Sequence, residues 1–133
     1  MEFRHVVTVF LEHEDKILIL KRSPEVRTYQ GKWAGVSGSV DGGSPLMQAM
    51  KEVEEETGLR RSDVRFRKAG REFEVDDSGL GYRWIVHPFL FEALSLERFT
   101  LDWEHSEHKW IHPRELDLFE TVPLLQESLQ RVT

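Results

Sequence analysis

The stretch SPLMQAMKEVEEETGL, residues 44–59, decides the fold class. Ser44 followed by Pro45 is typical of a helix N-cap and a first helical position. Apolar residues then recur at helical spacing until Gly58, where the helix is expected to end: Leu46, Ala49, Met50 and Val53. The stretch therefore predicts one well-defined helix that begins after Ser44.

This helix carries four glutamates within five positions, at 52 and 54–56. Glu55 and Glu56 follow Glu52 by three and four residues, so the three side chains project from one helix face. Like charges at this spacing repel by roughly a few tenths of a kcal/mol per pair, and a bound divalent cation would turn the repulsion into attraction. Carboxylate oxygens suit Mg²⁺ or Mn²⁺. The alternative interpretation is a solvated acidic face without a ligand.

The segments on both sides of the helix indicate strands. Residues 3–11 and 17–20 are apolar and β-branched, and they predict two strands joined by a hairpin or short loop. Residues 22–32 predict a loop, and 33–41 predict short strand pieces. Residues 64–75 and 82–94 predict strands around a turn at 76–79, and a second helix is expected from about Pro123 to Arg131, with Leu124, Leu125 and Leu129 facing inward. This order predicts an α+β fold with a mixed sheet.

Composition limits the functions open to the chain. Its 133 residues fit one domain, 1–133, and 18 basic against 24 acidic residues give a net charge of −6, which disfavours general nucleic-acid binding. The sequence contains no cysteine, which excludes disulfides, thiolate zinc sites and cysteine nucleophiles. Charges interrupt every apolar run, so we expect no membrane insertion, no signal peptide and a cytoplasmic location.

The segment from Gly38 to Leu59 resembles the signature of the Nudix hydrolases, which runs Gly, five residues, Glu, seven residues, then Arg-Glu-apolar-X-Glu-Glu-X-Gly-apolar. Residues 51–59, KEVEEETGL, match its second half. Its first half differs, because the spacing is one residue short and Gly42-Gly43-Ser44 stand where the glutamate is usual; Lys51 also replaces the arginine. Residues 107–116, EHKWIHPREL, are similar to a further segment common in the family. The resemblance implies an α/β/α sandwich with a central mixed sheet.

The resemblance also implies an activity, in which metal-activated water cleaves the pyrophosphate bond of a nucleoside diphosphate derivative or nucleotide. The metal, Mg²⁺ or Mn²⁺, would be held by side chains and by one backbone carbonyl before the helix: Glu52, Glu55 and Glu56, with Ser37 or Gly38. Lys51 would orient a metal-binding glutamate, although a lysine reproduces the forked arginine contact imperfectly. The general base would be Glu52 itself or an acid of the later loop, Glu104 or Glu107.

Substrate contacts are expected from the loop that leads to the glycine-rich turn. Arg22, Arg27 and Lys32 are the cations that could hold phosphate, and Trp33 could stack on a base or belong to the core. The sequence does not choose among nucleoside triphosphates, oxidised nucleotides, ADP-ribose-like compounds and nucleotide sugars, and a homodimer stays open.

Three alternative functions are compatible with parts of this sequence to different degrees. The missing glutamate and Lys51 would also suit a Nudix-fold module that binds nucleotides without cleaving them. Isomerisation of a prenyl diphosphate would need a cysteine, which is absent. Zinc bound by His105, His108 and His112 is disfavoured, because Trp110, Ile111 and Pro113 argue against one continuous helix there.

Overall fold

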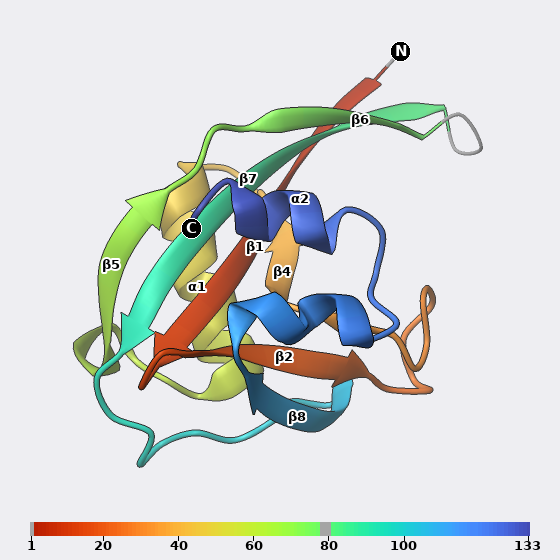
Figure 1. Ribbon diagram of the computed structural model, residues 1–133. Helices are drawn as coiled ribbons and strands as arrows, with labels where there is room; N and C mark the ends of the chain where they lie inside the picture. The colour runs from red at the N-terminus through yellow and green to blue at the C-terminus, as the bar shows by residue number, and fades with distance from the viewer. Residues whose placement is uncertain (1, 78–80) are drawn as a thin grey trace.

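The computed structural model describes residues 2–77 and 81–133, which form a mixed sheet with a helix on each face (Figure 1). The strands are β1 (Glu2–His13), β2 (Lys16–Arg22), β3 (Trp33–Ala34), β4 (Val36–Ser39), β5 (Val64–Ala69), β6 (Phe73–Asp77), β7 (Tyr82–Ala93) and β8 (His105–Ile111). The helices are α1 (Pro45–Thr57) and α2 (Leu125–Gln130), with single 3₁₀ segments η1 (Arg61–Asp63) and η2 (Pro113–Leu118). The turn predicted at 76–79 includes Ser78 and Gly79, which lie outside the described residues.

The long strands β1 and β7 form the centre of the sheet. They run parallel, from Glu2 opposite Tyr82 to Glu12 opposite Glu92, whereas the other pairings between the described strands β1–β8 are antiparallel. β4 pairs with β1, β6 with β7, and β8 with β2. The predicted α+β class with a mixed sheet is thus confirmed.

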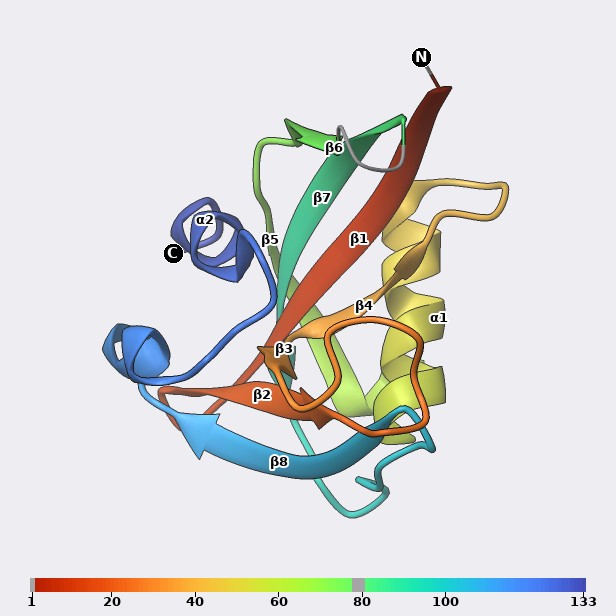
Figure 2. The same ribbon diagram turned by 90° about the vertical axis from the view of Figure 1, so that its right-hand side faces the viewer.

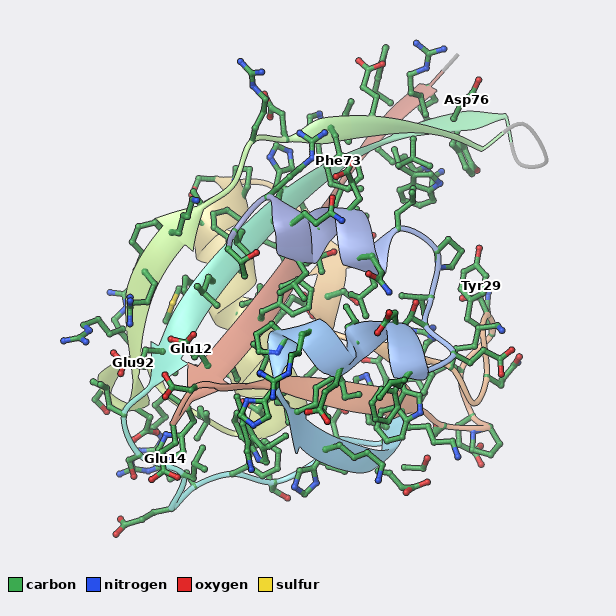
Figure 3. All side chains as sticks on the ribbon, viewed as in Figure 1. Glu12, Glu14, Tyr29, Phe73, Asp76 and Glu92 are labelled. Atoms are coloured by element: carbon green, nitrogen blue, oxygen red, sulfur yellow. The ribbon has the colours of Figure 1, made fainter. Side chains whose placement is uncertain are left out.

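The two carboxylates at the end of this parallel pair lie side by side (Figure 3). Nη1 of Arg67 lies 3.6 Å from Oε1 of both Glu12 and Glu92, and Arg65 also donates to Glu92. Arg65 and Arg67 are exposed and form ion pairs across strands.

The core has two layers, one on each face of the sheet. Figure 2 shows α1 on one side of β1 and β7 and α2 on the other. Val7, Val9 and Leu11 of β1 face α1, with Leu18 and Leu20 of β2. The opposite face packs against α2 and η2 through Phe10, Ile17, Ile19, Leu90, Leu116, Leu125 and Leu129. Because strand side chains alternate between faces, each central strand is buried on both sides, and the expected α/β/α sandwich results.

Helix α1 begins and ends where the sequence predicts. Oγ of Ser44 accepts from the backbone N–H of Met47 at 3.1 Å, and Pro45 is the first helical residue. Gly58 ends the helix with φ of 73°, and its N–H donates to the carbonyl of Glu54 at 2.9 Å. A Cβ at Gly58 would lie 2.7 Å from the carbonyl oxygen of Arg98, so glycine is required there for both reasons.

Two predicted elements are wrong in detail. Residues 64–75 do not form one strand, since β5 ends at Ala69 and β6 begins at Phe73. Gly70 lies between them, where a Cβ would lie 2.6 Å from the carbonyl oxygen of Arg131. The C-terminal helix starts at Leu125, and Leu124 is exposed with a positive φ of 67°, so it does not join the core.

Among residues 2–77 and 81–133, no helix is long and apolar enough to cross a bilayer.

Candidate active site

Helix α1 presents two of its glutamates to the protein interior. Glu52 and Glu56 are four residues apart and keep only 9% and 1% of their surface exposed, whereas Glu55 is exposed. The three carboxylates that helical spacing grouped together are therefore not equivalent. Burial of two adjacent carboxylates is unfavourable without a compensating charge or shared proton.

Glu56 is the most deeply buried acid of this site. Its Oε1 accepts weakly from the backbone N–H of Ser37 at 3.4 Å and lies 3.7 Å from Nε2 of His105. Burial raises the pKa of Glu56 well above its usual value, and the charges of Glu52 and Glu104 raise the pKa further. Of the carboxyl groups of this site, Glu56 is therefore the one best suited to hold a proton when no cation is bound.

The side chain of Glu52 packs against strand β4 at Gly38. Nε2 of Gln48, one helical turn earlier, donates to its Oε2 at 2.6 Å, and a side-chain hydrogen bond also joins Glu52 to Glu56. Burial raises the pKa of Glu52. A Cβ built at Gly38 would lie 2.2 Å from Cδ of Glu52, so a glycine is needed for β4 to approach this carboxylate.

The loop before β8 closes the site from the other side. Oδ1 of Asp102 accepts from Nδ1 of His105 at 2.7 Å, and the side chain of His105 is only 2% exposed. Glu104 is half-buried, and burial followed by the charge of Asp102 raises its pKa. Asp102, Glu104 and Glu52 therefore add negative charge around Glu56.

A β-bulge determines which residues of this segment face the helix. Lys21 pairs with Glu107, but the next residue, Arg22, pairs with His105. The extra residue reverses the alternation, so His105 faces α1 while Glu107 turns to the opposite side of the strand. Glu107 is exposed there and bonds to Nζ of Lys21 at 3.2 Å.

The donor set fits a hard cation that a substrate helps to bind. Among residues 2–77 and 81–133, no three His, Asp or Glu side chains lie close enough together to hold a metal ion by themselves. Two buried carboxylates are nevertheless typical of Mg²⁺ sites, which use one or two carboxylates and complete the shell with water and substrate phosphates.

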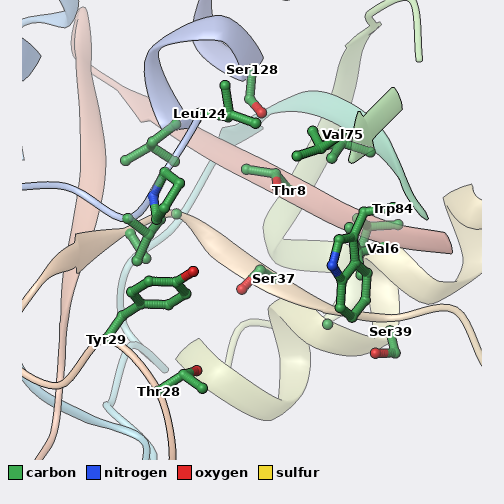
Figure 4. Close-up of a pocket in the computed structure, with 18 of the residues that line it drawn as sticks. Val6, Thr8, Thr28, Tyr29, Ser37, Ser39, Val75, Trp84, Leu124 and Ser128 are labelled. Carbon is green, nitrogen blue, oxygen red and sulfur yellow. The ribbon is translucent and has the colours of Figure 1, made fainter. Parts of the chain in front are cut away.

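A pocket of about 560 Å³ opens on the other side of β4 (Figure 4). Its lining is mainly apolar and includes two aromatic side chains, Tyr29 and Trp84, which lie on opposite sides with Ser37 between them. Ser37 and Gly38 line this pocket and also touch the glutamate pair, so strand β4 joins the two features.

The four expected substrate residues have different positions. Arg22 lines the pocket, where its Nε donates to the carbonyl of Thr28 at 2.9 Å. Arg27 is exposed and does not line the pocket. Lys32 lies outside the pocket lining too, and its Nζ donates to Oε1 of Glu120 at 2.5 Å.

Trp33 is a core residue. It keeps 8% of its surface exposed and packs edge-on against Phe119 with ring centroids 5.6 Å apart. Large aromatic side chains stabilise the interior, and this one is therefore not available to stack on a base. Of the two alternatives for Trp33, the structure supports the core.

Other expectations can now be located. Lys51 is exposed, and its charge lowers the pKa of Glu52, so it lies close enough to act on that carboxylate. The three histidines considered for zinc do not gather: His105 is buried beside Glu56, whereas His108 is exposed and packs on Phe99 with ring centroids 4.8 Å apart.

Sequence reasoning missed Asp102 and Gln48, and it considered His105 only as one of three possible zinc ligands. Gln48 had a signal, because it stands four residues before Glu52 on the same helix face. His105 and Asp102 had none, since their approach to Glu56 depends on the bulge and on the pairing of β8 with β2.

Comparisons with known proteins agree with this architecture. A family model described as the NUDIX domain matches residues 2–132. A MutT NUDIX hydrolase from Burkholderia pseudomallei is 23% identical with a TM-score of 0.74 and full coverage of both chains. An Ap4A hydrolase from C. elegans is 17% identical (TM-score 0.72, 98% of this chain and 94% of that one), and a dihydroneopterin triphosphate pyrophosphohydrolase from E. coli is 20% identical (0.71, 98% and 96%).

These structural similarities show the fold alone, because each of the three sequence identities is below 25%. No curated protein matches the sequence.

Proposed function

This chain belongs to the Nudix family, and we propose that it is a Mg²⁺- or Mn²⁺-dependent hydrolase that cleaves the pyrophosphate bond of a nucleoside diphosphate derivative or nucleotide. The observation that carries the proposal is the buried pair Glu52 and Glu56, which borders a large pocket through Ser37 and Gly38. We propose residues 1–133 as one functional domain and the cytoplasm, where such nucleotides are used, as its location.

Glu52 and Glu56 would hold the cation, with Glu55 at the exposed rim and a backbone oxygen of Ser37 or Gly38. When bound, the divalent cation would neutralise the diphosphate and lower the pKa of the attacking water. The protein would contribute position and electrostatics, since the carboxylates are fixed by the helix, by Gln48 and by the close contact with Gly38.

Among the three candidate bases, Glu104 has the most suitable environment. It is half-buried with a raised pKa, and it is close enough to Glu56 for the two charges to interact. A general base works best when its pKa is near the operating pH, and a raised carboxyl pKa moves in that direction. Glu107 is engaged by Lys21 on the other side of β8. We therefore propose Glu104 as the base and withdraw Glu107.

The pocket would bind the nucleoside part of the substrate. Tyr29 and Trp84 offer aromatic faces, and Thr8, Ser37 and Ser128 offer hydroxyl groups for hydrogen bonds. Arg22 is the cation of the lining and would contact phosphate near β4. Two of the neighbours reported above are named for Ap4A and for dihydroneopterin triphosphate, and both compounds join an aromatic base to a phosphate chain.

The test is a panel of nucleoside triphosphates, oxidised nucleotides, ADP-ribose, nucleotide sugars and dinucleoside polyphosphates with Mg²⁺ or Mn²⁺. Phosphate release after added pyrophosphatase reports cleavage. Wild type should cleave at least one compound, and Glu52→Gln should lose about 10²-fold or more in kcat while its melting temperature is kept. A panel with no cleaved compound would contradict the hydrolase proposal.

A nucleotide-binding module without catalysis is the second candidate. It is favoured by the contact between Gln48 and Glu52, because the amide occupies one carboxylate oxygen that a cation would use. Micromolar binding of nucleotides with equal affinity in wild type and Glu56→Gln, together with no cleavage, would establish this candidate in place of the hydrolase.

A further inference from the structure

One buried histidine at the site is not used by the proposed reaction. His105 keeps 2% of its side chain exposed and lies between Asp102 and Glu56. Its Nδ1 is 2.7 Å from Oδ1 of Asp102, and because a carboxylate can only accept, Nδ1 carries the hydrogen. In the neutral ring the lone pair then belongs to Nε2, which points toward Glu56.

The contact between His105 and Glu56 is not a hydrogen bond. Nε2 lies 3.7 Å from Oε1 of Glu56, beyond hydrogen-bond range, and in this tautomer Nε2 has no hydrogen to donate. Metal–nitrogen and metal–oxygen bonds are each about 2.1 Å long, and two of them together exceed this gap, so one cation can reach both atoms. A carboxylate that holds Nδ1–H while Nε2 binds a cation is the usual support of a metal-binding histidine.

We propose that His105 is a nitrogen ligand of the catalytic cation and that it makes this site prefer Mn²⁺ and later transition metals to Mg²⁺. The proposal rests on the hydrolase function above and adds the identity of the metal. Mg²⁺ is a hard cation that favours oxygen ligands, whereas imidazole favours transition metals. A site of oxygen ligands alone would not discriminate in this way.

Electron spin-echo envelope modulation of the Mn²⁺-loaded protein tests the ligand directly. Wild type should show nitrogen modulation that changes when histidine is labelled with ¹⁵N, and His105→Gln should lose it. His108→Gln is the matched control, because His108 is an exposed histidine three residues further on the same strand and should keep the modulation. The comparison of ¹⁵N-labelled with unlabelled wild type uses no variant, so it still shows whether a histidine binds Mn²⁺ if His105→Gln does not fold.

Isothermal titration calorimetry tests the proposed preference of the site for Mn²⁺ over Mg²⁺. Wild type should bind Mn²⁺ more tightly than Mg²⁺, and His105→Gln should lose about 10- to 100-fold in Mn²⁺ affinity with a smaller change for Mg²⁺. Mn²⁺ that binds without nitrogen modulation, with hydrolysis intact, would overturn the proposal and leave the hydrolase function standing. Failure of Mn²⁺ to bind, together with no hydrolysis, would instead remove the proposed function and this inference with it.

Discussion

Adding one methyl group at Gly38 is expected to displace the carboxylate of Glu52 and to lower kcat by about 10²-fold. The new Cβ would lie 2.2 Å from Cδ of Glu52 and 2.5 Å from its Oε2. Gly38 sits in a regular strand paired with Val7 of β1, so the backbone is held on its other side and the glutamate must move.

The size of the effect follows from this distance. Ordinary contacts begin near 3.4 Å, so the Cδ of Glu52 must shift by about 1.2 Å. A misplacement of about 1 Å at a catalytic group can cost on the order of 10²-fold in rate. The fold should tolerate the change, because the end of a side chain moves more easily than backbone, and overpacking typically costs about 1–3 kcal/mol.

The assay is kcat on the best substrate of the panel, with the Mn²⁺ dissociation constant and the melting temperature measured in parallel. A matched background is Glu52→Asp, which shortens the side chain by one methylene and draws the carboxylate back from the new Cβ. Gly38→Ala should therefore change kcat much less in the Glu52→Asp background than in wild type. Full activity and unchanged Mn²⁺ affinity in Gly38→Ala would refute the reasoning.

Three further outcomes are expected. Burial and the Glu52 charge raise the pKa of Glu56 above its usual 4.5, so the metal-free wild type should lose stability as pH rises above about 4.5 and through the raised pKa. Glu56→Gln should lack this loss in thermal melts from pH 4 to 9, and equal slopes would contradict the assignment. Glu104→Gln should lower kcat by about 10²-fold, whereas Glu107→Gln should stay within about twofold in the same assay, because Glu107 only pairs with Lys21. Lys51→Ala should reduce kcat and Lys51→Arg should preserve it, since the charge acts on Glu52; an unchanged rate in Lys51→Ala would remove that role.

The sequence by itself determined the helix and the group of three acids on one of its faces. Ser44, Pro45 and Gly58 act through local backbone geometry, so the bounds of α1 could be predicted without tertiary contacts. The spacing of Glu52 and Glu56 follows from helix geometry, and the apolar runs of β1 and β2 indicate strands that are buried on both faces. Family resemblance then identified the architecture that these elements form.

Tertiary structure decided which groups meet at the pair. Helical spacing could not separate buried Glu56 from exposed Glu55, because the difference depends on where β4 packs. The bulge in β8 placed His105 at the site and Glu107 away from it, and packing against Phe119 placed Trp33 in the core. These positions depend on contacts between residues far apart in the chain, and a local pattern carries no information about register or packing at that range.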